Sequence, residues 1–273
     1  MKTGDIVARR SYGCDLYFRI KEIGEDQTCL LTGINYRLTV SAQQDDLSPV
    51  AVSNIVNLSK LLREELNERI DSILKKRQEE RDNIMVDAEI IQKPGKVLHI
   101  DADREYVMLC QKNYDRLVMN AASEVVAEQD QPTAIVGLLK KHMPDILIIT
   151  GHDSLADRGD KENIDKYKSS KYFAESVKAA RNYNPSKDSL VIIAGACQSF
   201  YERLIENGAN IASSPKRILI HALDPVFIAE KIAYAPFDHI LSANEILENT
   251  ITGRNGMGAF QTRGTMREGV RIL

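Results

Sequence analysis

The sequence lacks the features that mark a secreted, membrane or nucleic-acid-binding protein. No apolar run approaches the length needed to cross a bilayer, and the first residues, MKTGDIVARRSYG, contain no apolar stretch typical of a secretory signal. We therefore expect synthesis and folding in the cytoplasm. The net charge is -3 at pH 7, so the overall balance favours neither a nucleic acid nor an anionic membrane as partner.

Cysteines are few and are not spaced as metal ligands. The four, Cys14, Cys29, Cys110 and Cys197, form no CxxC or Cys/His pattern, so they predict neither a zinc site nor a disulfide framework. No other ligand cluster indicates a metal or an organic cofactor. Three of the four are typical of small buried apolar residues, whereas Cys197 has a different sequence context.

The composition is that of an ordinary globular protein, 43% apolar and 27% charged over 273 residues, which favours one main core and an accessory module. Residues 1–55 contain short alternating apolar runs, which predict a small antiparallel β-barrel of the SH3-like kind or a curled sheet. Residues 56–92 hold an amphipathic helix over 57–85, a connector that could instead pair with a partner or form a dimer. The Pro-Gly pair in QKPGK marks the boundary before a domain over 93–273.

That last domain is predicted to be α/β, because continuous apolar runs alternate with helical patterns. We expect a flavodoxin-like, mostly parallel sheet with helices on both faces, whose ligands gather outside the carboxyl ends of the strands. The expected strands are 97–100, 123–127, 145–150, 190–195, 210–213 and 218–222. The expected helices are 104–119, 132–142, 165–183, 199–207, 226–233 and 243–251.

Two chemically active residues follow strands of this sheet. His152 comes just after DILIIT, and Cys197 comes just after LVIIAG. A cysteine in a strand-to-helix turn lies near a helix N-terminus, where the dipole favours the thiolate. If the two side chains meet, His152 can accept the thiol proton and later return one to a leaving amine. The pair predicts a cysteine peptidase with Cys197 as nucleophile and His152 as acid/base.

This pattern resembles that of the caspase-like peptidase clan, in which one apolar strand ends in His-Gly and a later strand ends in Ala-Cys. Ala196-Cys197-Gln198 fits the pattern, whereas Asp153 stands where the clan has glycine. The resemblance implies an oxyanion hole formed by the backbone N–H groups of Asp153 and Cys197, since an aspartate can still donate its N–H.

A second resemblance covers nearly the whole chain. The stretches GDIVARRSYGCDLYFRI, PGKVLHIDAD, PDILIITGHD, IAGACQSFYERLIENGANIASSPKRILIHALDPV and GAFQTRG are similar to those of the sporulation-specific protease family known as YabG. The family implies a cysteine peptidase that processes spore-coat and cortex-associated proteins by cleavage after basic residues. Its functional pair maps onto His152 and Cys197, and its location is the cytoplasm of the sporulating cell or the spore coat.

Cleavage after Arg or Lys requires a carboxylate in the pocket for the basic side chain. The candidates are Asp101 and Asp103 after the first strand of the domain, and Asp224 after the last, although each is also typical of a strand-end or helix-capping residue.

The segment GRNGMGAFQTRG predicts a mobile loop or a hairpin over the site. Such a protease could also nick itself at its exposed-looking arginines, which are Arg9, Arg10, Arg254, Arg263 and Arg267.

Two other functions remain open from the sequence. In an amidotransferase-like thiol hydrolase the histidine follows the cysteine, and His221 is placed to serve, although GACQS lacks the second glycine usual beyond such a nucleophile. In a receiver-like signalling domain, Asp101 and Asp103 would hold Mg²⁺ and a later aspartate would be phosphorylated. No aspartate ends the DILIIT strand, which disfavours that function.

Overall fold

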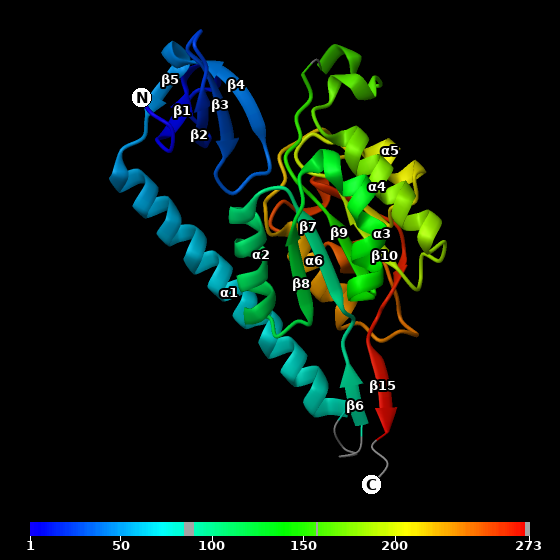
Figure 1. Ribbon diagram of the computed structural model, residues 1–273. Helices are drawn as coiled ribbons and strands as arrows, with labels where there is room; N and C mark the ends of the chain where they lie inside the picture. Colours follow the sequence, from blue (N-terminus) through cyan, green and yellow to red (C-terminus); the bar gives the residue numbers. More distant parts are fainter. Residues whose placement is uncertain (85–89, 157, 271–273) are drawn as a thin grey trace.

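The computed structural model describes residues 1–84, 90–156 and 158–270. It consists of a small antiparallel sheet, one long helix and a larger α/β unit (Figure 1). Within those residues, no helix combines the length and the apolar character that a membrane span requires.

The N-terminal residues form a five-stranded antiparallel sheet in the order β4-β3-β2-β1-β5. Its strands are β1 (Ile6–Arg9), β2 (Tyr17–Ile23), β3 (Thr28–Gly33), β4 (Thr39–Gln43) and β5 (Leu47–Pro49). Alternate side chains, among them Val7, Phe18 and Leu31, are fully buried, as the period of a strand requires. The described strands β4 and β5 lie at opposite edges and do not pair, so the sheet is open and the predicted closed barrel is not found.

The helix α1 (Val52–Ile84) is 33 residues long and runs beside α2 (Arg104–Arg116) (Figure 1). Ile70 and Ile73 are buried against the main core. Arg77 donates a hydrogen bond to the Leu117 carbonyl oxygen at 2.7 Å. The second half of α1 therefore packs within the chain, whereas Leu61 in its first half is exposed.

The central sheet has six strands in the order β13-β11-β10-β9-β7-β8, all parallel except β13. These strands are β7 (Val97–Asp101), β8 (Ala121–Val125), β9 (Ile146–Ile149), β10 (Val191–Ala194), β11 (Ile211–Ser213) and β13 (Met257–Ala259). Counted along the chain, the five parallel strands have the doubly wound order 2-1-3-4-5, whose switch point lies between β7 and β9.

Helices cover both faces of this sheet, because successive strand residues point to opposite sides. In β9, Ile146 and Ile148 join a core with α2 and α6 (Asp224–Ala233), whereas Leu147 and Ile149 join a second core. The second core includes residues of α3 (Gln131–His142), α4 (Ser170–Tyr183) and α5 (Tyr201–Glu206). The expected α/β layers are confirmed, with most element ends within a few residues.

Four expected elements differ from the structure. The stretch 218–222 is not a strand, because its backbone bonds to loops: Ala222 N–H donates to the Asn35 carbonyl oxygen at 2.8 Å. The helix expected at 165–183 begins only at Ser170, and α7 (Ala243–Ile246) ends early. The stretch expected as a mobile loop or a hairpin contributes β13, which pairs with β11 at the sheet edge, and β14 (Thr262–Arg263), which pairs with β12 (Ile240–Leu241).

A further ladder had no counterpart in the predictions. β6 (Ile90–Lys93) pairs antiparallel with β15 (Arg267–Val270), so the two ends of the α/β unit are joined at its base (Figure 1). Short strands of this kind carry too little periodicity to be recognised from sequence.

The packing of α6 against α1 predicts a pH-dependent stability. Burial raises the pKa of Glu230 from the ordinary 4.5 to about 7, although Arg77 opposes the shift. Above pH 4.5 the unfolded chain ionises at this position before the folded chain does, so the folded state loses stability between about pH 4.5 and 7. In a Glu230→Gln variant this loss, up to about 3 kcal/mol, should disappear.

Urea unfolding of the Cys197→Ala protein with and without Glu230→Gln, at pH 5 and pH 8, measures this effect. Glu248→Gln is the control, because Glu248 is exposed and its pKa is lowered by Lys231. If the free energy of unfolding changes equally between pH 5 and pH 8 with and without Glu230→Gln, the prediction is wrong.

Candidate functional site

His152 lies at the switch point of the sheet, three residues after β9 ends. The preceding Gly151 has no room for a side chain, because a Cβ there would approach the Glu128 side chain to 2.8 Å. Glu128 in turn accepts a hydrogen bond from the His152 N–H at 2.9 Å. This local packing directs the imidazole into the crevice beside β7.

The imidazole of His152 is buried and is available as a base. Its Nε2 has no hydrogen-bond partner among the described residues and lies 3.8 Å from Asp103 Oδ2. The Tyr106 ring packs beside it, with ring centroids 5.4 Å apart. Burial lowers the pKa of His152, although Asp101, Asp103 and Glu128 oppose the shift. The resting imidazole is therefore neutral and can accept a proton.

Cys197 lies in the turn that follows β10, and its thiol is fully buried. The turn begins at Gly195, whose φ of 104° favours glycine. The sulfur accepts a hydrogen bond from the Ile220 N–H at 3.2 Å. Burial raises the pKa of the thiol to about 12, against the opposing effects of hydrogen bonds from the backbone N–H groups of Ile220 and Arg37.

This environment differs from the expected one. A helix dipole was expected to favour the thiolate, but α5 begins only at Tyr201 and is six residues long. Burial therefore favours the neutral thiol of Cys197, as it favours the neutral imidazole of His152.

Asp153 joins the His152 loop to the Cys197 turn. Its carboxylate accepts hydrogen bonds from the hydroxyls of Ser170 and Ser199, at 2.5 and 2.8 Å. It also accepts from the backbone N–H groups of Ser154 and Ser169, at 2.9 and 2.8 Å. Burial raises the pKa of Asp153 to about 6, although these bonds oppose the shift. The aspartate therefore fixes the two loops relative to each other.

Of the predicted oxyanion donors, the Asp153 N–H is already engaged. It donates to the carbonyl oxygen of Arg37, at 3.4 Å. The second predicted donor, the Cys197 N–H, lies in the turn that follows β10.

Asp101, the first candidate for the basic pocket, binds a guanidinium. Arg37 Nε donates to Asp101 Oδ2 at 2.8 Å, and both side chains are at most 2% exposed. Nη1 of Arg37 donates to the Ala222 carbonyl oxygen, and Nη2 lies 3.3 Å from Cys110 Sγ. Despite its burial, the pKa of Asp101 is lowered, because Arg37 and nearby histidines favour its charged form.

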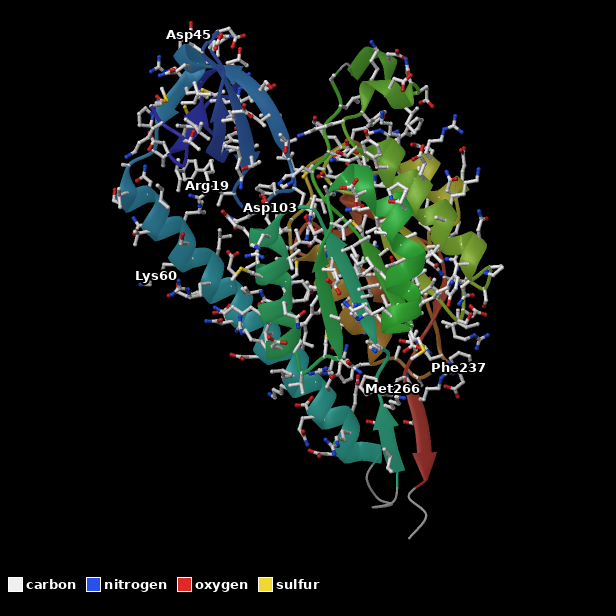
Figure 2. All side chains as sticks on the ribbon, viewed as in Figure 1. Arg19, Asp45, Lys60, Asp103, Phe237 and Met266 are labelled. Atoms are coloured by element: carbon white, nitrogen blue, oxygen red, sulfur yellow. The ribbon has the colours of Figure 1, made fainter. Side chains whose placement is uncertain are left out.

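The other two pocket candidates have structural partners. Asp103 accepts a hydrogen bond from the Glu105 N–H as the N-cap of α2, and it lies on the side that faces the antiparallel sheet (Figure 2). Asp224 accepts from the backbone N–H groups of Ile251 and Thr252, at 2.6 and 3.2 Å. Only Asp101 therefore holds a cationic side chain in full burial.

His221 also lies near the site. It follows Ile220, whose backbone contacts the Cys197 sulfur, and burial lowers its pKa to about 4. Its Nδ1 accepts a hydrogen bond from the Leu223 N–H at 3.2 Å, so one nitrogen is already occupied.

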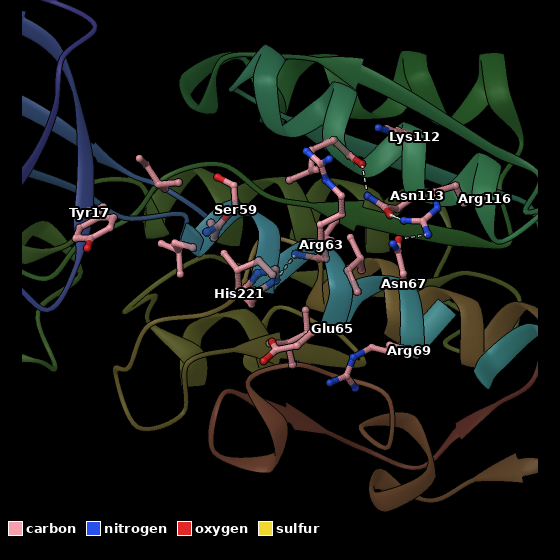
Figure 3. Close-up of a pocket in the computed structure, with 18 of the residues that line it drawn as sticks. Tyr17, Ser59, Arg63, Glu65, Asn67, Arg69, Lys112, Asn113, Arg116 and His221 are labelled. Carbon is pink, nitrogen blue, oxygen red and sulfur yellow. Dashed lines mark hydrogen bonds between the residues drawn. The ribbon is translucent and has the colours of Figure 1, made fainter. Parts of the chain in front are cut away.

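A cavity of about 500 Å³ adjoins His221 on the side of α1 and α2 (Figure 3). Its wall includes the apolar residues Leu58 and Leu62 of α1, and Asn35 from the loop between β3 and β4. The cavity thus borders the segment that leads to Arg37.

Three residues of this site were not identified from the sequence. Arg37 lies in the β3–β4 loop of the small sheet, where nothing in its local pattern indicated contact with the distant α/β unit. Tyr106 and Glu128 follow β7 and β8, so the rule that places ligands at strand ends could have selected their segments. No group of three or more His, Cys, Asp or Glu side chains suited to a metal occurs within the described part of the chain.

Comparison with known proteins shows the family of this chain. The model of the family described as YabG peptidase U57 matches residues 2–271. The chain is also 38% identical over 284 residues to the sporulation-specific protease YabG of Bacillus subtilis (strain 168), covering 98% of this chain and 97% of that relative. The chain belongs to the YabG peptidase family. It is therefore a peptidase that acts on proteins, and its family places it in sporulation.

No solved structure matches this YabG-family chain. The geometry of the site therefore comes from this chain alone, and the aspartate after the histidine is one of its distinctive parts.

The carboxylate of Asp153 should be essential for the stability of this YabG-family site. In an Asp153→Ala variant, one buried N–H group, one partly buried N–H group and two hydroxyls lose their acceptor, and we expect a loss of about 3 kcal/mol in the free energy of unfolding. Ser199→Ala, which removes one of these bonds, should cost about 1 kcal/mol. Urea unfolding in the Cys197→Ala background compares them, and equal losses would be evidence against the role given to Asp153.

Proposed function

We propose that this peptidase is a cysteine endopeptidase that cleaves spore-coat and cortex-associated proteins after Arg or Lys. Cys197 is the nucleophile and His152 the acid/base. The observation that carries the proposal is the buried Nε2 of His152, which has no hydrogen-bond partner among the described residues and lies in a loop that Asp153 ties to the Cys197 turn. A neutral imidazole with a free nitrogen is what proton transfer from a thiol requires.

In the proposed reaction, His152 takes the Cys197 proton as the sulfur attacks the scissile carbonyl carbon. The N–H groups of Asp153 and Cys197 stabilise the negative charge that develops on the carbonyl oxygen. His152 then protonates the departing amine, which leaves a thioester on Cys197. Water, deprotonated by His152, hydrolyses the thioester and restores the thiol.

Specificity for basic residues is assigned to Asp101. Its carboxylate already binds the guanidinium of Arg37 in a buried pocket, with the Ala222 carbonyl oxygen and the Tyr106 ring as further contacts. A buried carboxylate selects a cation, because a neutral side chain would leave the charge unpaired. Lysine would bind less well than arginine, since the pocket offers several acceptors in a fork.

We further propose that the central sheet is caspase-like and that the small N-terminal sheet is related to SH3-like barrels. The strand order and the antiparallel edge strand β13 support a caspase-like arrangement, and the open five-stranded sheet is consistent with an SH3-like relative. We place the enzyme in the cytoplasm of the sporulating cell or on the spore coat, with proteins as substrates and no nucleic acid or membrane as partner.

Removal of the catalytic pair should abolish cleavage. We expect Cys197→Ala and His152→Ala to lose at least about a thousandfold in kcat/KM on fluorogenic arginyl peptides, because each removes a step of the reaction. His221→Ala should retain activity, with folding of all three checked by circular dichroism. Loss through His221 with His152 dispensable would instead establish the amidotransferase-like arrangement.

Substitution of the pocket carboxylate should change selectivity. Asp101→Asn should lower kcat/KM for arginyl peptides by roughly a hundredfold, since a buried cation loses its counter-ion, and should affect peptides with a neutral residue at the cleavage site much less. Asp224→Asn is the control, as its carboxylate binds backbone amides. Unchanged preference for arginine in Asp101→Asn would reject this pocket.

A further inference from the structure

The loop between β3 and β4 enters the site as an extended peptide. Asn35 accepts a hydrogen bond from the Ala222 N–H at 2.8 Å. Tyr36 forms an antiparallel bridge with His221, and Leu38 forms a parallel bridge with Asp153. Residues 35–38 therefore pair with both walls of the crevice, one supplied after β9 and the other by the stretch beside Cys197. Proteases commonly bind substrates in this way, as an added strand.

The main chain of Arg37 lies at the predicted catalytic groups. Its carbonyl oxygen accepts the hydrogen bond from the Asp153 N–H, the donor assigned to the oxyanion hole. Its N–H is one of the groups that bind the Cys197 sulfur. One residue of the loop thus contacts both the residue next to His152 and the nucleophile.

The side chain of Arg37 fills the pocket assigned to a basic substrate residue. Its guanidinium is held by Asp101, by the Ala222 carbonyl oxygen and by the Cys110 sulfur. The Tyr106 hydroxyl donates to the carbonyl oxygens of Gly33 and Tyr36, at 2.7 and 2.9 Å, and so fixes the approach of the loop.

A buried ion pair that serves only to join two domains would need the side chain alone. It would not require the carbonyl oxygen of the same residue to lie on an oxyanion donor, nor the preceding residues to pair antiparallel beside the nucleophile. Residues 35–38 instead lie where the proposed reaction places a substrate. Their main chain pairs beside the nucleophile, the Arg37 carbonyl oxygen lies on the oxyanion donor, and the Arg37 side chain fills the basic pocket. The five arginines expected to be self-cleavage sites make no such contacts with the site.

We propose that residues 35–38 are a tethered substrate that blocks the cleft, and that Cys197 cuts the Arg37–Leu38 bond of its own chain to open it. This inference rests on the proposed function. Until the bond is cut, Arg37 excludes the basic residue of any other protein from the pocket.

The step uses only groups present in the chain and water. The Cys197 sulfur forms a bond to the Arg37 carbonyl carbon as its proton passes to His152. The bond from that carbon to the Leu38 nitrogen then breaks, and His152 protonates the new amine. Water hydrolyses the thioester, which gives a carboxylate on Arg37 and regenerates the thiol.

The first test follows the whole wild-type chain and Cys197→Ala by intact mass under denaturing conditions, with N-terminal sequencing of the products. We expect the wild type to give residues 1–37 and 38–273 at a rate independent of protein concentration, because the bond is cut within one molecule. Cys197→Ala should stay whole, even when mixed with wild type. A wild-type chain that cleaves arginyl peptides at a constant rate while its Arg37–Leu38 bond stays intact would overturn the inference.

The second test uses an arginyl chloromethyl ketone, which alkylates an accessible catalytic thiol. In the wild type, labelling of Cys197 should appear only as the 1–37 fragment appears. Arg37→Ala should be labelled without a lag and remain uncut at this position, while Arg37→Lys, which keeps the charge, should still be cut. Immediate labelling of uncut wild-type chains would also overturn the inference.

The two proposals fail differently. If neither the wild type nor a folded Arg37→Ala variant cleaves arginyl peptides or reacts with the probe, the proposed function is wrong. If both do so at equal rates and without a lag, only the tethered substrate is wrong. The wild-type arm does not depend on the folding of any variant.

Discussion

The structure depends on one buried ion pair between units far apart in sequence. Arg37 comes from the small antiparallel sheet and Asp101 from the end of β7, and both are withdrawn from water. Removing two charges from water costs several kcal/mol per ion, which is offset only where every donor and acceptor finds a partner. Asp101 meets this condition through Thr150 and the Asp103 N–H, at 2.6 and 2.9 Å. In the uncut chain, the same pair holds the loop between β3 and β4 in the crevice that contains His152.

The chemistry proposed for the crevice follows from the burial of His152 and Cys197. Burial favours the neutral forms of both His152 and Cys197, so the proposed nucleophile is not prepared in advance as a thiolate. The charge must then arise only when a carbonyl group is in place to receive the attack, which protects a reactive sulfur from other reagents. Asp153 contributes in a different manner from the glycine usual in the caspase-like clan. Its N–H donates to the Arg37 carbonyl oxygen, while its carboxylate secures the loops that carry both proposed catalytic residues.

The parallel strands and the positions of His152 and Cys197 could be predicted because they depend on local features: continuous apolar runs and the residues that end them. Asp101 was found by the same rule. The partner of Asp101 could not be found, since Arg37 reaches it across 64 positions and its own segment is typical of a surface hairpin. The stretch 218–222 was wrongly expected to be a strand because it has a strand's composition, while its hydrogen bonds go to loops. Whether an apolar run pairs with a strand or a loop is decided by tertiary contacts.

The position of Arg37 within a hairpin has a consequence for how the protein would persist in the cell. Residues 28–32 pair with residues 39–43 on the far side of the loop, from Thr28 with Gln43 to Thr32 with Thr39. A break after Arg37 would leave these pairs intact, so the two pieces would remain one particle and would separate only on denaturation. The change could not be reversed, because rejoining a peptide bond in water is unfavourable. Each molecule that had cut itself would therefore stay in the two-chain form for the rest of its life.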